Sequence, residues 1–148
     1  MFEHLDDQAR RSVVFAQEAA RSLGHSSVGS GHLLLGLLYV DGGEAATALT
    51  SEGIDPATVR HQVEKTGVNL PPATEGRIPL ASEVETALEL SQQMALDLGD
   101  SRTGTGHILL ILIGQREGVA ARVLLSLGAD LSRVRQQVIK LHASSSNN

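Results

Sequence analysis

Val28-Gly29-Ser30-Gly31-His32-Leu33-Leu34-Leu35 recurs 75 residues later as Thr103-Gly104-Thr105-Gly106-His107-Ile108-Leu109-Leu110. Each copy is a glycine-rich turn that leads into an apolar run. The turn contains a hydroxyl residue, Ser30 or Thr105, whose side-chain oxygen can accept hydrogen bonds from the free N–H groups of the first helical turn that follows. The pattern predicts two buried helices, each of which begins at the glycine-rich turn.

The two stretches belong to a longer internal repeat. Aligning residues 2–66 with residues 77–141 at the constant offset of 75 gives 24 identities in 65 positions without a gap. Such self-similarity indicates two copies of one supersecondary unit, each too small to bury its apolar face alone. We therefore expect repeat 1 (residues 2–66) and repeat 2 (residues 77–141), joined by a linker at residues 67–79, to pack as one pseudo-twofold domain over residues 1–148.

Length and composition fit one helical domain. A chain of 148 residues can bury roughly 70% of the surface that it exposes when unfolded. Aromatic residues make up only 2% of the chain, so the core must consist of Leu, Val, Ile and Ala, a composition that favours closely packed helices. The chain has no cysteine, which excludes disulfides, thiolate metal sites and a cysteine nucleophile.

Charge and hydropathy argue against several classes of partner. The formal net charge is −5 and Lys and Arg form no cluster, which argues against nucleic acid. No apolar run approaches the roughly 18 residues that a membrane span needs. The first residues lack the basic segment and apolar stretch of a signal peptide. We expect a cytoplasmic monomer that binds neither nucleic acid nor membrane and carries no cofactor.

Helix start and stop signals divide each repeat into four segments. In repeat 1 we expect helices at residues 6–23, 31–40, 44–52 and 55–65, separated by glycines. Repeat 2 follows the same plan at residues 82–98, 106–115, 118–127 and 130–142. The tail at residues 143–148 contains only Ala, Ser and Asn and is expected to be disordered. The predicted fold is all-α: an eight-helix bundle of two tandem four-helix repeats.

Several motifs, spread over nearly the whole chain, resemble a known family. They are Met1-Phe2-Glu3, Ala9-Arg10-Arg11, Ala16-Gln17-Glu18-Ala19, the two glycine-rich stretches, Gly118-Val119-Ala120-Ala121 and Arg133-Val134-Arg135-Gln136-Gln137-Val138-Ile139. Together with the tandem repeat they resemble the N-terminal domain of the ClpC-type AAA+ unfoldases, in its actinobacterial form. The resemblance implies the Clp N-domain fold and a domain that receives substrates, adaptors and phosphorylated arginines.

The resemblance places a phosphoarginine pocket at each of the two predicted helix starts. There the phosphoryl group sits among N–H groups of a helix N-terminus, and a Glu directly before the His takes the guanidinium. In this sequence both Glu positions are glycine, Gly31 and Gly106, and Asp6 replaces a neighbouring Thr. Each lost carboxylate removes a charge-assisted hydrogen bond worth about 1.5–3 kcal/mol. We predict weak or absent phosphoarginine binding, with Ser30, Thr105 and the first-turn N–H groups left for a simple anion.

A second family surface lies between the first helices of the two repeats, where cyclic peptide antibiotics bind. The resemblance assigns eight positions to it: Phe2, Arg10, Val13, Val14, Gln17, Leu80, Glu85 and Glu89. An apolar floor flanked by charges suits a peptide groove. Leu80 stands where the family has an aromatic residue, so we expect peptide binding to be weakened by about 1 kcal/mol. The sequence leaves open whether Val14 faces the groove, because only one of two adjacent valines on a helix faces inward.

The histidines also have a plain structural interpretation. His32 and His107 stand at equivalent helix starts, where we expect each ring to bond nearby backbone. Six histidines without cysteine, and without a His-x-x-x-His pair, predict no metal site. The sequence contains no phosphate-binding Gly-x-x-x-x-Gly-Lys-Ser/Thr loop and no Gly-x-Ser-x-Gly motif. We therefore expect no catalytic residues and no enzymatic activity.

Three functions remain open from the sequence. The first is a stand-alone decoy that captures cyclic peptide antibiotics aimed at a Clp unfoldase. The second is an adaptor or regulator that docks on the Clp unfoldase, its adaptors or its substrates. The third is the N-terminal domain cut from a full-length ClpC ATPase.

Overall fold

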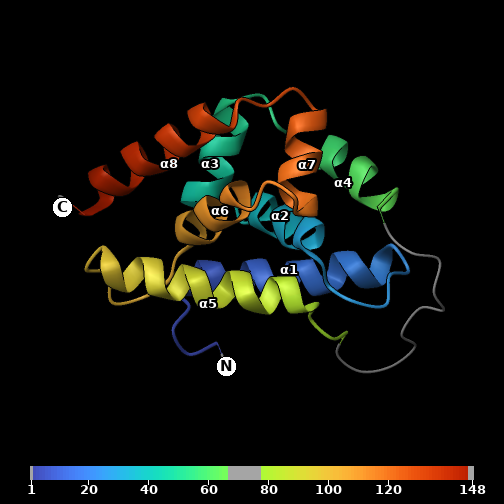
Figure 1. Cartoon of the computed structure of the whole chain (residues 1–148), viewed down its shortest axis with the longest axis horizontal. Helices are drawn as coiled ribbons and strands as arrows, with labels where there is room; N and C mark the ends of the chain where they lie inside the picture. The colour runs from blue at the N-terminus through green and yellow to red at the C-terminus, as the bar shows by residue number, and fades with distance from the viewer. Residues whose placement is uncertain (1, 67–77, 147–148) are drawn as a thin grey trace.

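The computed structural model describes residues 2–66 and 78–146, and this part of the chain forms eight helices in two repeats (Figure 1). Repeat 1 contributes α1 (Asp7–Ser22), α2 (Ser30–Tyr39), α3 (Glu44–Ser51) and α4 (Pro56–Glu64). Repeat 2 contributes α5 (Ser82–Asp97), α6 (Thr105–Gly114), α7 (Val119–Ser126) and α8 (Leu131–Ser146). The predicted all-α fold with eight helices is confirmed.

The tail differs from the sequence prediction. Helix α8 continues through Ser146, so the expectation of disorder is wrong for residues 143–146. Neither Gly nor Pro follows His142, and Ala and Ser extend a helix at little cost. Residues 147–148 and most of the expected linker, residues 67–77, lie outside the described residues.

Helices α2 and α6 form the centre of the bundle. Residues 30–38 of α2 are all buried, and so is most of α6, because helices cover them on both sides. Helices α1 and α5 lie along one side, and α3, α4, α7 and α8 lie on the other (Figure 1). This sandwiched position explains why both central helices are apolar nearly all round.

Helix α1 crosses α2 at very close range at Gly36. A Cβ atom at this position would overlap the backbone carbonyl oxygen of Ser12 and lie 3.0 Å from the backbone nitrogen of Ala16. Repeat 2 carries the side chain of Ile111 at the equivalent position. This tight backbone contact therefore belongs to repeat 1 and depends on the absence of a side chain at Gly36.

The two repeats exchange backbone contacts just before their helices. Leu5 forms an isolated parallel bridge with Thr103, and Val28 forms the equivalent bridge with Leu80. In the same places Asp6 donates its N–H to the Thr103 carbonyl, and the N–H of residue 81 donates to the Val28 carbonyl, both at 2.9 Å. The segment that enters the first helix of each repeat is therefore held by the segment that enters the second helix of the other.

Ser30 and Thr105 also form hydrogen bonds between the two repeats. The sequence prediction that they cap their own helices is wrong, because Gly29 and Gly104 occupy the cap positions. The Ser30 hydroxyl instead accepts from the N–H of Ala120 in α7 at 3.1 Å, and the Thr105 hydroxyl accepts from the N–H of Ala45 in α3 at 3.3 Å. Each repeat thus supplies a buried hydroxyl to a helix start in the other repeat.

We expect Ser30→Ala to lower the free energy of unfolding by about 1–2 kcal/mol, because the buried N–H of Ala120 loses its acceptor. The midpoint of urea unfolding should fall while the slope stays the same. Ser126→Ala is the matched control, since the Ser126 hydroxyl donates only to the carbonyl of residue 123 in its own helix. Equal midpoints for the two variants would contradict a contribution from the exchanged hydrogen bond.

Candidate peptide cleft and helix N-terminal sites

A cleft of about 470 Å³ runs along α1. It is lined by Phe2, Arg10, Val13, Val14, Gln17, Glu18 and Arg21. The structure therefore brings together five of the eight predicted peptide-binding residues and adds Glu18 and Arg21. The other three do not line this cleft: Leu80 is held by its bridge to Val28, and Glu85 and Glu89 are exposed on α5.

The two adjacent valines that line the cleft differ in exposure. Val13 is 6% exposed and packs in the core, whereas Val14 is 52% exposed. Val14 thus presents an apolar side chain to the cleft, which answers the question that the sequence left open. Arg10 and Arg21 place positive charge along the same helix, with Glu18 between them. The cleft combines an apolar surface with charges at its rim, which is the composition of a peptide-binding groove.

Gln17 shapes the edge of this cleft. Its amide nitrogen donates to the Ile78 carbonyl at 2.7 Å, and its amide oxygen accepts from the Ile78 N–H at 3.0 Å. The paired bonds fix the segment that enters α5 against α1. Gln17 therefore positions the second repeat beside the cleft.

A second cavity, of about 180 Å³, lies at the start of α2. There the Ser30 N–H donates to Oε1 of Glu83 at 3.0 Å, and the Gly29 N–H donates to Nδ1 of His32 at 2.9 Å. Glu83, a residue of α5, thus supplies a carboxylate to the helix start where the sequence predicted a simple anion. A phosphate at this position would have to displace Glu83.

Gly31 and Gly106, the glycines that precede the two helix-start histidines, each lie against a side chain of the opposite repeat. A Cβ atom at Gly31 would lie 3.0 Å from Cγ1 of Val119. A Cβ atom at Gly106 would overlap Oε1 of Glu44, which is the repeat-1 equivalent of Val119. At the start of α6, the opposite repeat therefore contributes the carboxylate of Glu44. At the start of α2, it contributes the apolar side chain of Val119.

The rings of His25 and His32 meet at the start of α2, with Nδ1 of His25 2.7 Å from Nε2 of His32. Because Nδ1 of His32 accepts from the backbone, the proton of its neutral ring lies on Nε2 and is donated to His25. Burial lowers the pKa of His32 to about 4, and the charge of His25 adds to this effect. His32 therefore stays neutral and caps α2, as the sequence predicted for a ring bonded to nearby backbone.

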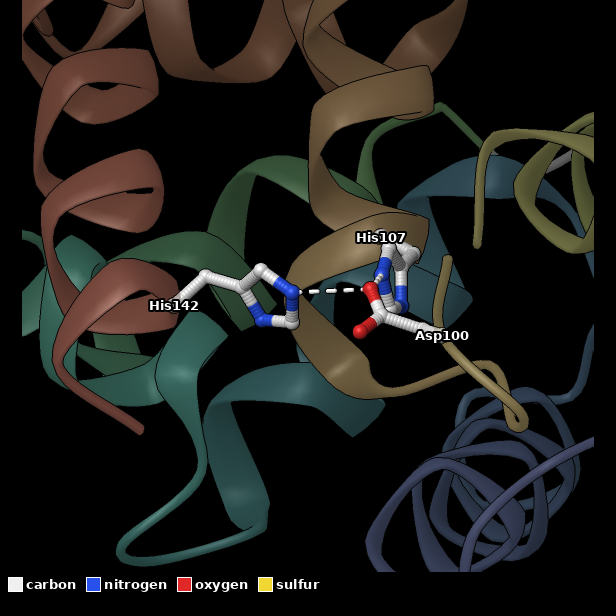
Figure 2. A group of neighbouring side chains, drawn as sticks. All are labelled: Asp100, His107 and His142. Atoms are coloured by element: carbon white, nitrogen blue, oxygen red, sulfur yellow. Dashed lines mark hydrogen bonds and ion pairs between the residues drawn. The ribbon is translucent and has the colours of Figure 1, made fainter. Parts of the chain in front are cut away.

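The equivalent site at α6 contains a carboxylate between two imidazoles (Figure 2). Oδ2 of Asp100 lies 2.9 Å from Nε2 of His107 and 2.8 Å from Nε2 of His142, and Nδ1 of His142 lies 3.3 Å from Oε2 of Glu44. Nδ1 of His107 accepts from the Gly104 N–H at 2.9 Å, as His32 does in repeat 1.

The charges of this group shift two pKa values in opposite directions. Burial opposes ionisation of Asp100, but the hydrogen bonds from His107 and His142 outweigh it and lower the pKa of Asp100. Burial also opposes protonation of His142, but the carboxylates of Glu44 and Asp100 outweigh it and raise the pKa of His142. The arrangement therefore favours positive charge between these carboxylates.

Sequence reasoning missed this group because its members come from three helices and a loop. Asp100 lies before α6, His107 lies in α6, His142 lies in α8 and Glu44 begins α3. Only Asp100 and His107 are near one another in sequence. The one available signal was the repeat itself, since Asp100 replaces His25 at an equivalent position.

Within residues 2–66 and 78–146, no helix combines the length and the hydropathy that a bilayer crossing requires.

Comparison with known proteins gives a consistent result over the whole chain. The family model described as Clp repeat (R) N-terminal domain matches residues 4–110 and 80–147. The chain is 43% identical over 145 residues to the chaperone protein ClpB of Oceanobacillus iheyensis and 42% identical over 147 residues to the chloroplastic chaperone protein ClpC of Pisum sativum. These alignments cover 97% and 99% of this chain but only 18% and 16% of the relatives, so the chain spans less than a fifth of their length.

Solved structures show the same fold. The N-terminal domain of ClpD from Arabidopsis thaliana matches with a TM-score of 0.80 and 25% identity, over 95% of this chain and 98% of that domain. A ClpV N-domain, solved in complex with a VipB peptide, matches with a TM-score of 0.71 and 17% identity, over 89% of this chain and 82% of the ClpV chain.

Proposed function

The chain belongs to the Clp repeat N-terminal domain family, and on this premise we propose that it is a non-catalytic docking module that captures peptides in the cleft along α1. The exposed Val14 beside Phe2 and the rim charges is the observation that carries the proposal, because it leaves apolar surface available in a cleft of about 470 Å³. The ClpV relative, solved with a VipB peptide, supports peptide capture by this fold. A cytoplasmic, monomeric protein is part of the same proposal.

We further propose that its ligands include cyclic peptide antibiotics directed at Clp unfoldases, which the module sequesters. Five of the positions that the family resemblance assigns to this surface line the cleft. The helix-start sites support a reduced role in phosphoarginine capture, since the Glu83 carboxylate accepts the Ser30 N–H where a phosphate would bind and the Glu44 carboxylate lies against Gly106. The module would then keep the peptide surface and lose the phosphoarginine sites.

Calorimetric titration with such a cyclic peptide tests the cleft. We expect Val14→Asp to weaken binding at least about tenfold, because a charge would replace apolar contact area, and tenfold corresponds to about 1.4 kcal/mol. Leu125→Asp is the matched control, since Leu125 is 48% exposed on α7, outside the cleft. Equal losses in both variants, or no binding by the unaltered protein, would contradict the proposed cleft.

A proteolysis assay and a titration with free phosphoarginine distinguish sequestration from an adaptor or substrate-receptor function. Added to a Clp unfoldase and protease inhibited by the peptide, the module should restore proteolysis at concentrations stoichiometric with the peptide. A change in unfoldase activity without any peptide would favour the adaptor or regulator function instead. Binding of free phosphoarginine by the unaltered protein would contradict the loss of the phosphoarginine sites.

A further inference from the structure

The group at the start of α6 plays no part in the peptide cleft, and its chemistry is that of a cation site. Asp100, His107 and His142 each offer a ligand atom, and these three atoms lie within 4.8 Å of one another (Figure 2). We propose that Asp100 and His142 bind a divalent transition-metal ion such as Zn²⁺ or Co²⁺, while His107 and Glu44 hold these two ligands in place.

The backbone decides the role of His107. Its Nδ1 accepts from the Gly104 N–H at 2.9 Å, so the proton of the neutral ring lies on Nε2 and is donated to Asp100 at 2.9 Å. A metal ion on Nε2 would require the proton to move to Nδ1, where it would face the Gly104 N–H. His107 therefore orients the Asp100 carboxylate, which is the role of an outer-shell donor.

His142 has the opposite arrangement. Its Nε2 donates a proton to Asp100, and a metal ion would take the place of that proton. Its Nδ1 lies 3.3 Å from Oε2 of Glu44, so the remaining ring proton would be donated to a carboxylate while the Nε2 lone pair binds the ion. Metal-binding histidines in proteins are held in this way, by donation of the second ring N–H to a carboxylate. Glu44 thus fixes the tautomer that metal binding needs.

The spacing of the two ligand atoms suits one ion. Nε2 of His142 and Oδ2 of Asp100 lie 2.8 Å apart. Zinc binds imidazole nitrogen and carboxylate oxygen at about 2.0–2.2 Å in tetrahedral geometry, which places two neighbouring ligand atoms about 3.4 Å from each other. Only a small movement would therefore admit the ion between them. Imidazole nitrogen also favours zinc, cobalt and nickel over magnesium and calcium.

The surroundings supply space and negative charge. The cavity at this helix start measures about 320 Å³ and is also lined by Asp6 and Arg102, so waters can complete the coordination of the ion. The Arg102 guanidinium donates to the carbonyls of residues 3 and 5, at 3.1 and 3.4 Å, and three carboxylates line the same cavity. The sequence of repeat 1 lacks both proposed ligands, since His25 stands in place of Asp100 and residue 67, equivalent to His142, is glycine.

Titration of the untagged full chain with ZnCl₂ and CoCl₂ tests the proposal. We expect one ion per chain and a change in the visible absorption of Co²⁺ as a nitrogen ligand enters. His142→Gln and Asp100→Asn should each abolish saturable binding, whereas Glu44→Gln and His107→Gln should weaken it by about 10–100-fold. His61→Gln, which removes an exposed histidine of α4, is the matched control and should change nothing.

Paramagnetic Co²⁺ gives a readout on the unaltered protein that does not depend on whether variants fold. It should broaden backbone amide NMR signals near residues 100 and 142 and spare those of α4. Absence of saturable binding, broadening centred elsewhere, or equal binding by a folded His142→Gln variant would overturn the site. A loss in His107→Gln as complete as that in His142→Gln would overturn the outer-shell role of His107.

Discussion

Replacing Gly36 by Ala should destabilise the protein by about 3 kcal/mol or more, the upper part of the range for overpacked cores. The added Cβ would overlap the Ser12 carbonyl oxygen in α1 and crowd the Ala16 nitrogen at 3.0 Å. Both obstacles are backbone atoms, so no rotamer change relieves the overlap and α1 must move away from α2. Since domains of this size are stable by about 5–15 kcal/mol, a large share of the stability would be lost.

Urea unfolding measures this cost, and Gly114→Ala is its control. Gly114 ends α6, is exposed, and has open space around an added Cβ. The same substitution there should be neutral or stabilising by about 0.4–1 kcal/mol, because it reduces the freedom of the unfolded chain. An unchanged unfolding midpoint for Gly36→Ala would show that the two helices separate at no cost.

Acidification from pH 7 to pH 4 should remove about 3 kcal/mol of stability through His32, at about 1.36 kcal/mol per pKa unit. The pKa of His32 is lowered from 6.5 in the unfolded chain to about 4 in the fold. Between these values the unfolded chain binds the proton and the folded chain does not, so stability falls as pH falls. A protonated ring would also place an N–H on Nδ1 against the Gly29 N–H, which breaks the cap of α2.

Two variants separate this effect from that of other histidines. His32→Gln should be less stable at pH 7 but lose less stability on acidification. His142→Gln should lose more, because the raised pKa of His142 contributes stability below its unfolded pKa of 6.5, and that contribution disappears as pH rises through its folded value. Guanidinium unfolding at a series of pH values provides the measurement. If the free energy of unfolding changed with pH in the same way for the unaltered protein and both variants, the proposed contributions of His32 and His142 would be contradicted.

The sequence predicted the fold well because the fold is built from repeated local signals. The constant offset of the two repeats, the glycine turns and the helical spacing of apolar residues predict where the eight helices begin and end. These predicted boundaries lie within one or two residues of the observed ones. The exception is the end of α8, where a stretch of Ser and Ala carries no signal that distinguishes helix from tail.

The candidate sites were predicted less completely, because they depend on contacts between repeats. Phe2, Arg10 and Val14 were assigned to one surface from the family resemblance, and these three residues do line one cleft. The role of Ser30 could not, since its partner Ala120 lies 90 residues away. The same holds for Glu44 and His142, which meet only because α8 packs beside α3.

The exchanged hydrogen bonds between the repeats also set an order of events during synthesis. When repeat 1 has left the ribosome, the Ala45 N–H still lacks Thr105 and the Asp6 N–H still lacks Thr103. Both partners emerge about 40 residues later, which takes roughly 2–8 s at 5–20 residues per second. During this interval the nascent first repeat exposes the apolar α2 face that repeat 2 later covers. The first half can therefore complete these hydrogen bonds, and cover this face of α2, only after the second half has been translated.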